Sequence, residues 1–230
     1  MKTEQKRWTA IVPARAGSKG LPGKNVKLLG GIELYQHAVL CARQAGAEHI
    51  LVSTDISQIL AGTHDFTVHA RAAHLADDQT PMKDVVLELL AAHSIRGTVV
   101  LLQPTSPLRT PDAVRQALAL HEAGAYELTL SVSEADRSVL KYGQIQDGRF
   151  VPLQKPEYCF RNRQHLPAVY RPNGAIYVFD AQWFLEQGDF VSTKMGAFLM
   201  PLEESIDIDV QADLLACEQI LDARKRALDP

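Results

Sequence analysis

The chain has 230 residues, of which 46% are hydrophobic and 22% charged, with a formal net charge of -3 at pH 7. This is the composition of an ordinary globular domain, and it argues against nucleic acid or a membrane surface as the main partner. The three cysteines are odd in number and far apart, so the sequence suggests neither a disulfide framework nor a zinc ligand set, and a reducing cytoplasm is the simplest interpretation.

Short apolar runs alternate with helical patterns through the first half of the chain. Strands are predicted over residues 9–13, 49–53, 66–69 and 98–102, and helices over residues 33–45, 82–93 and 111–121. Thr110 is expected to cap the last of these helices, with Pro111 at its first position. Strands and helices that alternate at this spacing predict an α/β fold, in which a mostly parallel sheet carries helices on both faces.

The pattern changes after Ser133. Residues 134–170 mix charges, glycines, prolines and aromatics without a clear period. Because aromatic residues persist there, we expect a small inserted lobe within one domain of residues 1–230, rather than a linker. A returning strand over 174–179, a short helix over 181–187 and a long amphipathic helix over 210–227 complete the prediction. No apolar run approaches the roughly 20 residues that span a bilayer, and the first residues lack the apolar core of a signal peptide.

A basic loop with three glycines follows the first predicted strand, reading Pro13-Ala-Arg-Ala-Gly-Ser-Lys-Gly-Leu-Pro-Gly-Lys-Asn25. Small residues let backbone N–H groups approach phosphate oxygens, and cations neutralise a triphosphate. Arg15 suits bidentate phosphate contact, while Lys19 and Lys24 act as movable point charges. The Walker A and GxGxxG patterns are both absent. A flexible, solvated loop is the alternative, but a position directly after the first strand favours phosphate binding.

An acidic pair lies near the carboxyl end of the chain. Asp207 and Asp209 alternate with Ile206, Ile208 and Val210. In an extended segment both carboxylates point to one face and the aliphatic side chains to the other. Two hard oxygen ligands side by side suit Mg²⁺ beside a triphosphate. The alternative is a pair of solvated acids before a helix N-terminus, which favours acidic residues in any protein.

Two further stretches carry polar groups suited to a sugar acid. Arginines, amides and tyrosines between Arg161 and Tyr177 suit a polyhydroxylated substrate with a carboxylate, although these residues alone favour a basic surface of the lobe. Gln103 lies at the carboxyl end of a predicted strand, where ligands bind in open α/β sheets. The eight histidines are scattered without metal-binding spacing, and Cys41 and Cys217 are expected to pack in helix cores.

Five segments together resemble one known family. They are residues 13–25, 53–55, 102–109, 171–177 and 205–209. In this order they closely resemble the CMP-sialic acid synthetases (acylneuraminate cytidylyltransferases), and the resemblance covers essentially the whole chain. It implies a Rossmann-like nucleotidyltransferase core and a homodimer built through the inserted lobe. It also implies an enzyme that uses magnesium to join CMP from CTP to the anomeric hydroxyl of a sialic acid, releasing pyrophosphate.

The resemblance assigns roles to particular residues. CTP would be held by Arg15, Gly17, Ser18, Lys19, Lys24, Asn25 and Arg71, the last of which reads cytosine. The sugar acid would contact Gln103, Lys141, Arg163, Arg171 and Tyr177, and Arg163 would reach the site of a partner subunit. Asp207 and Asp209 would hold Mg²⁺, and they would carry catalysis together with Arg15, Lys19 and Lys24.

The chain departs from the family pattern at two positions. Val139 replaces a proline that usually precedes the matching lysine, and Met82 stands where a small polar residue is expected near the nucleotide. Several alternatives therefore stay open. The same reaction on legionaminic, pseudaminic or Kdo-type acids is one, and a catalytically silent nucleotide-binding protein is another. A dinucleotide-dependent oxidoreductase is disfavoured by the missing first glycine and the additional cations of the loop.

Overall fold

The computed structural model describes residues 7–228, and a seven-stranded sheet lies at its centre. Its strands stand in the order β11-β7-β10-β6-β1-β4-β5. Their bounds are β1 (Trp8–Ala14), β4 (His49–Thr54), β5 (Thr67–Ala70), β6 (Thr98–Leu101), β7 (Leu128–Ala135), β10 (Val169–Asp180) and β11 (Met195–Leu199). All neighbouring pairs are parallel except those of β10, which runs antiparallel to β6 and β7. The predicted mostly parallel sheet is confirmed.

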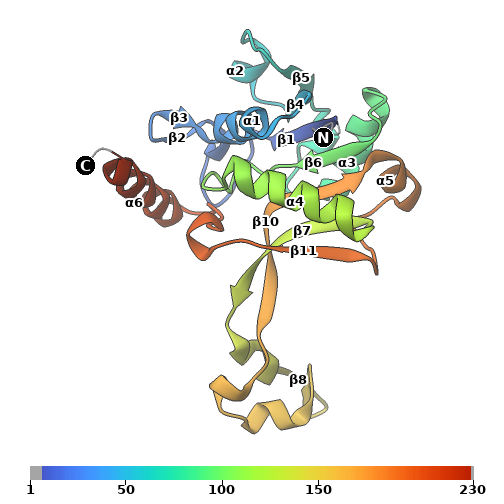
Figure 1. The fold of residues 1–230 in the computed structure, drawn as a ribbon, viewed down its shortest axis with the longest axis vertical. Coiled ribbons are helices and arrows are strands. Elements are labelled where there is room, and N and C mark those ends of the chain that lie inside the picture. The colour runs from blue at the N-terminus through green and yellow to red at the C-terminus, as the bar shows by residue number, and fades with distance from the viewer. Residues whose placement is uncertain (1–6, 229–230) are drawn as a thin grey trace, which may run out of the picture.

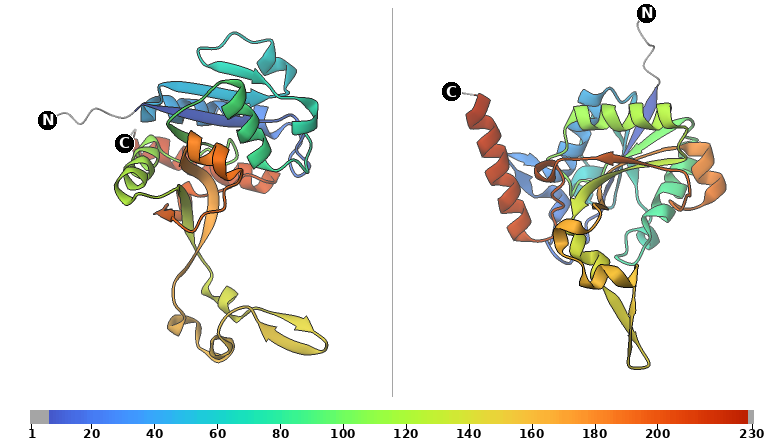
Figure 2. Two further views of the ribbon diagram at one scale, coloured as in Figure 1. Left: turned by 90° about the vertical axis from the view of Figure 1, so that its right-hand side faces the viewer. Right: turned by 60° about the horizontal axis from the view of Figure 1, so that its bottom comes forward.

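Helices cover both faces of the sheet, as the sequence predicts (Figures 1 and 2). They are α1 (Leu34–Ala45), α2 (Ser57–Leu60), α3 (Met82–Ala92), α4 (Pro111–Gly124), α5 (Ala181–Gln187) and α6 (Gln211–Leu228). Helices α1 and α4 pack on one face, and α3 and α5 on the other. The Thr110 Oγ1 accepts a hydrogen bond from the Ala113 N–H at 3.2 Å, so the predicted cap of α4 is present. Within the described residues, no helix is long and apolar enough to cross a membrane.

The core follows from the alternation of side chains along β1. Ala10 and Val12 contribute to the core under α1 and α4, whereas Ile11 joins the core under α3 and α5. Every residue of β1 is buried, because a central parallel strand has a helix layer on each side. A third cluster forms where α6 packs on the small β2 (Leu28–Leu29) and β3 (Ile32–Glu33) hairpin. Cys41 and Cys217 are buried in α1 and α6, as expected, and burial raises the pKa of Cys217 to about 11.

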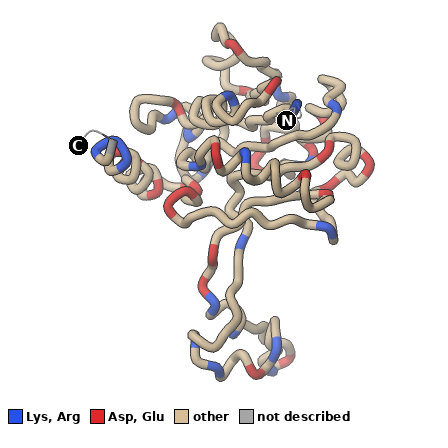
Figure 3. Tube along the Cα trace, in the orientation of Figure 1, with Lys and Arg blue, Asp and Glu red and all other residues tan. Residues whose placement is uncertain are grey.

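The strands β7 and β10 continue beyond the sheet as a ribbon that carries a projecting lobe (Figure 1). The lobe contains η3 (Arg137–Lys141), the hairpin of β8 (Gly143–Gln146) and β9 (Arg149–Pro152), η4 (Pro156–Phe160) and η5 (Arg163–His165). β10 begins at Val169, earlier than the predicted strand over 174–179, and its pairing with β7 shifts between Pro172 and Tyr177. Charged residues of both signs are spread along the chain in the core and the lobe (Figure 3).

Candidate active site

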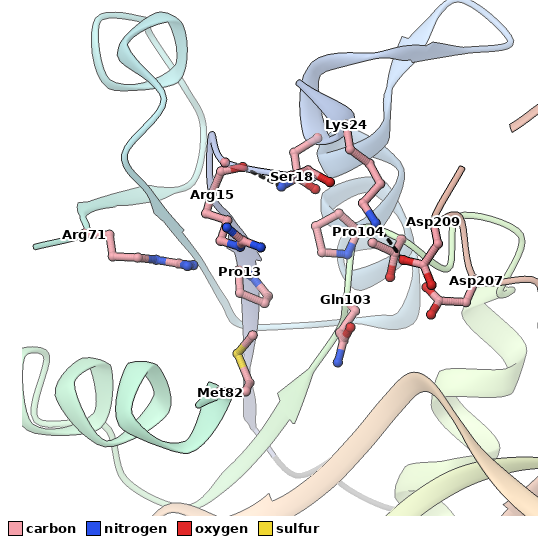
Figure 4. A pocket seen from close by; sticks show the side chains of 13 residues that line it. Pro13, Arg15, Ser18, Lys24, Arg71, Met82, Gln103, Pro104, Asp207 and Asp209 are labelled. Carbon is pink, nitrogen blue, oxygen red and sulfur yellow. Dashed lines mark hydrogen bonds and ion pairs between the residues drawn. The ribbon is translucent and has the colours of Figure 1, made fainter. Parts of the chain in front are cut away.

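A pocket of about 200 Å³ opens at the carboxyl ends of the parallel strands β1, β5 and β6. This is the edge at which open α/β sheets bind ligands. The segments around it come from the loop after β1, the residue after β5, the start of α3, the turn after β6 and the acidic pair before α6 (Figure 4). Many residues predicted from sequence line it: Arg15, Gly17, Ser18, Lys24, Asn25, Arg71, Gln103, Asp207 and Asp209. Met82, the first residue of α3, also lines it (Figure 4).

The loop after β1 is held by contacts of its own side chains and of a neighbouring strand end. The Asn25 side chain donates to the Arg15 carbonyl at 2.8 Å, and Asp55, at the end of β4, accepts from the Ala16 N–H at 2.7 Å. Gly23 has φ +66°, a left-handed conformation that glycine adopts without steric cost. A Cβ at Gly20 would lie 2.5 Å from the Asp209 carbonyl oxygen, so only glycine lets this loop approach the acidic segment so closely.

Lys24 joins the basic loop to the acidic segment. Its buried ammonium donates to the Ile208 carbonyl at 2.7 Å and to Asp209 Oδ1 at 3.0 Å (Figure 4). Ile208 is fully buried, and its N–H donates to the Thr105 carbonyl at 2.7 Å. This buried anchor fixes the backbone between the two acids. Val210, which the alternating pattern placed with the buried aliphatic residues, is 46% exposed.

Asp207 and Asp209 line the same pocket, as the alternation predicts. Loss of solvent around Asp207, followed by the charge of Asp209, raises the pKa of Asp207, while a hydrogen bond to Thr105 opposes the shift. Two carboxylates that face the same pocket are stabilised by a cation. Within residues 7–228 no group of three or more His, Cys, Asp or Glu side chains could hold a metal. Two carboxylates completed by ligand oxygens are nevertheless a usual Mg²⁺ site, so the pair fits that ion.

Arg71 forms the opposite wall of the pocket. Its guanidinium donates to Ser53 Oγ at 3.1 Å and to the Ser53 carbonyl at 2.9 Å. Burial lowers the pKa of Arg71 to about 10, so the side chain stays cationic at neutral pH. The backbone N–H of Arg71 donates to the Thr54 carbonyl at 2.7 Å. Residues 53–55 belong to one of the segments that resemble the family, but no role could be assigned to them from the sequence. In the structure they hold Arg71 and the loop after β1.

Two of the predicted loop cations are paired with a carboxylate that sequence reasoning did not single out. Arg15 and Lys19 both contact Asp78, and the Lys19 distance is 3.1 Å. Lys19 does not line the pocket, and its side chain is 79% exposed. The pattern offered no signal for this contact, because Asp78 is far from the loop in sequence.

The residues predicted to bind the sugar acid are not all brought together. Gln103 lines the pocket beside Gly174, whose positive φ of +77° lets the β10 bulge turn there. Tyr177 is half-buried on β10, with its ring 5.5 Å from that of Phe190, and Arg171 is exposed on the same strand. Lys141 and Arg163 lie on the lobe in η3 and η5, away from the pocket of their own chain. The side chain of Arg163 is 71% exposed and pairs with Asp136.

Two buried polar residues connect the turn after β6, the β10 bulge and the acidic segment. Arg109 Nη1 donates to the Gln103 carbonyl at 2.8 Å and to the Ala175 carbonyl at 2.9 Å. Asn173 donates to Ser205 Oγ at 3.0 Å and accepts from the Ala175 N–H at 3.1 Å. Both residues stand in segments that the sequence marked, 102–109 and 171–177. Their positioning role, however, depends on contacts between distant strands.

Comparison with known proteins gives consistent results. A family model described as cytidylyltransferase matches residues 9–194. The CMP-N,N'-diacetyllegionaminic acid synthase of Legionella pneumophila subsp. pneumophila is 34% identical over 96% of this chain and 99% of the relative. The N-acylneuraminate cytidylyltransferase of Streptococcus agalactiae serotype V is 30% identical over 89% of this chain. The chain spans 51% of that relative's length.

Solved structures share the fold. A structure of CMP:2-keto-3-deoxy-manno-octonic acid synthetase complexed with CTP aligns with a TM-score of 0.67 at 18% identity, covering 95% of this chain and all of that one. A 4-diphosphocytidyl-2C-methyl-D-erythritol synthase from Anaerococcus prevotii aligns with a TM-score of 0.62 at 14% identity, over 94% and 96% of the two chains. The Rossmann-like nucleotidyltransferase architecture expected from the sequence is thereby confirmed.

Proposed function

The chain belongs to the cytidylyltransferase family that includes the CMP-sialic acid synthetases, and we propose that it transfers CMP from CTP to a nine-carbon 2-keto sugar acid. It is an enzyme of the nucleotidyltransferase class. The observation that carries the proposal is a single pocket at the carboxyl edge of the sheet. Two of the loop cations, Arg15 and Lys24, lie there with the buried Arg71, Gln103 and the acidic pair.

The residues of this pocket divide into groups with separate tasks. The cations of the loop bind the triphosphate and stabilise the charge of the departing pyrophosphate. Arg71, held rigidly by Ser53, faces the pocket where the base of CTP is expected. Gln103 presents its amide to the sugar acid. The anomeric hydroxyl of the sugar attacks the α-phosphorus and gives up its proton, a phosphorus–oxygen bond to that oxygen forms, and the bond to pyrophosphate breaks.

Such a reaction needs positioning and charge neutralisation more than covalent help from the protein. Asp207 and Asp209 would hold Mg²⁺, which supplies Lewis-acid stabilisation of phosphate charge when bound. Lys24 hydrogen-bonds Asp209 and the backbone of Ile208, and it thereby fixes the distance between the loop and the acids. The protein's own contribution is thus a rigid frame that places the two substrates against each other.

The sugar acid belongs to the sialic or legionaminic type. N-acylneuraminate is the substrate class expected from the sequence, and legionaminic acid is the alternative that the relative from Legionella pneumophila supports. With CTP and Mg²⁺ we expect pyrophosphate release with N-acetylneuraminate or N,N'-diacetyllegionaminate, and less with the shorter Kdo. A coupled pyrophosphate assay over this panel measures it. Tight CTP binding without pyrophosphate from any sugar would favour a catalytically silent protein.

In the proposed homodimer, the lobe of each chain reaches the pocket of the other. Large apolar side chains on the lobe are exposed, among them Phe160 at 91%, Ile145 at 81% and Phe150 at 57%. Apolar exposure of this extent on a small projecting element marks a protein contact surface. Lys141 and Arg163 lie on the same lobe, away from their own pocket, so a second copy is the natural source of these groups.

Mixed dimers test this arrangement. Arg163→Ala and Asp209→Ala, each inactive alone, are expected to regain activity when co-expressed, because one site of the mixed dimer then has an intact pocket and an intact lobe. The maximum is about one quarter of wild-type activity when the chains mix at random, since half of the dimers carry one working site. Light scattering should give a mass twice 25.4 kDa for the wild type. No recovery in verified mixed dimers would place Arg163 in its own chain's site.

A further inference from the structure

Asp78 is placed against the basic loop by a rigid turn. The Asp77 carboxylate accepts from the Gln79 N–H at 2.7 Å, and the Thr80 N–H donates to the Asp77 carbonyl at 3.2 Å. The Thr80 hydroxyl donates to the His74 carbonyl at 3.0 Å. None of these bonds uses the Asp78 side chain, so the turn presents this carboxylate to the loop whether or not the loop is engaged.

The two oxygens of Asp78 contact different cations. One contacts Arg15 Nη1, and the other lies 3.1 Å from Lys19 Nζ. Hydrogen bonds from Lys19 and then Arg15 lower the pKa of Asp78, so it is ionised at neutral pH. A Cβ at Gly17 would lie 3.0 Å from Arg15 Nη1, so the absence of a side chain there leaves room for the guanidinium to reach Asp78.

The third cation of the loop, Lys24, also has a carboxylate partner. Lys24 pairs with Asp209, so each of Arg15, Lys19 and Lys24 has a carboxylate partner in this structure. The two pairings differ in one respect. Asp209 belongs to the acidic pair that fits Mg²⁺, whereas no task in the proposed reaction uses Asp78. The Asp78 carboxylate is paired with Arg15 and Lys19, the cations that a triphosphate would otherwise bind.

We propose that Asp78 is an internal counter-anion of the basic loop, which occupies Arg15 and Lys19 until the triphosphate displaces it and pairs with them again as pyrophosphate leaves. This inference rests on the proposed function, because it names the ligand as a polyphosphate. Without Asp78, Arg15 and Lys19 would lack their carboxylate partner and would bind phosphate-containing anions of any kind. With it, only a ligand that gains further contacts in the pocket displaces the carboxylate, and pyrophosphate is released more readily.

The test compares two neighbouring substitutions that change the net charge equally. Asp78→Asn removes the carboxylate at the cations, and Asp77→Asn removes one that only accepts a backbone bond. By calorimetry, inorganic pyrophosphate and CTP are each expected to bind Asp78→Asn about three- to tenfold more tightly than wild type. Asp77→Asn should stay within about twofold, because its charge lies outside the cation cluster.

A second substitution keeps the test decisive if Asp78→Asn fails to fold. Because Asp78 already neutralises Lys19, Lys19→Gln in the wild type should raise the Kd for pyrophosphate by less than about threefold. In the Asp78→Asn background, Lys19→Gln should raise the Kd for pyrophosphate by a larger factor. Unchanged or weaker binding by folded Asp78→Asn overturns the proposal, as does a large loss from Lys19→Gln alone. Failure of the proposed function looks different, since the wild type itself would then bind no CTP or would release no pyrophosphate with any sugar acid.

Discussion

Replacing Asp209 by alanine is expected to lower kcat by about 10²- to 10³-fold, because the acidic pair loses half of its charge at the phosphates. Asp207 alone then offers a single carboxylate to the ion. Lys24 also loses one of its two partners and keeps only the Ile208 carbonyl. Steady-state pyrophosphate release over a Mg²⁺ titration measures the effect, and the apparent Mg²⁺ requirement should rise.

Two further variants separate the contributions at this position. Asp209→Asn keeps an acceptor for Lys24 but removes the charge, so it should be almost as impaired as Asp209→Ala if charge dominates. Asp222→Ala changes an exposed acid on α6 and should leave turnover unchanged. Near-normal turnover of Asp209→Ala at limiting Mg²⁺ would exclude this residue as a metal ligand.

Replacing Gly20 by alanine is expected to reduce kcat/KM by about 100-fold. The new Cβ would stand 2.5 Å from the Asp209 carbonyl oxygen, and both partners in this clash are backbone-attached, so the loop and the acidic segment must separate. Misplacement of reacting groups by about 1 Å costs roughly this factor in rate. Titration of CTP and Mg²⁺ should show both requirements rising together, since the change moves the cations away from the acids.

Gly17→Ala provides the matched comparison for Gly20→Ala. A Cβ at this position meets only the terminal Nη1 of Arg15 at 3.0 Å, and that flexible group can shift. We therefore expect a milder effect, confined to the affinity for the nucleotide. A crystal structure of Gly20→Ala would show the loop displaced from Asp209. Activity like that of wild type would mean that the close approach of loop and acids is not needed for the reaction.

Local patterns identified much of this protein before its structure was known. The alternation of apolar runs and helical periods located β1, β4, β5, β6 and the helices around them, because packing on both faces of a parallel sheet imposes a period on the sequence. The basic loop and the Asp207–Asp209 pair could also be identified from the sequence, because the residues of each lie together in one short segment. β10 was predicted only over 174–179, and β7 and β11 were missed. Buried Thr129, Ser131 and Ser133 interrupt the apolar run of β7, whereas β11 is a partly exposed edge strand with a weak pattern.

Contacts between distant segments could be found only in the tertiary structure. No sequence pattern around Asp78 predicts its ion pair with Arg15, and none around Asn173 predicts its hydrogen bond to Ser205. Periodicity reports which face of an element is buried, whereas the partner on the other side depends on the order of strands in the sheet. The sequence by itself determined the fold class and the phosphate-binding character of the loop. The tertiary structure decided which carboxylates meet the loop cations, and it placed Lys141 and Arg163 on a lobe away from their own pocket, because β7 and β10 extend beyond the sheet that holds the site.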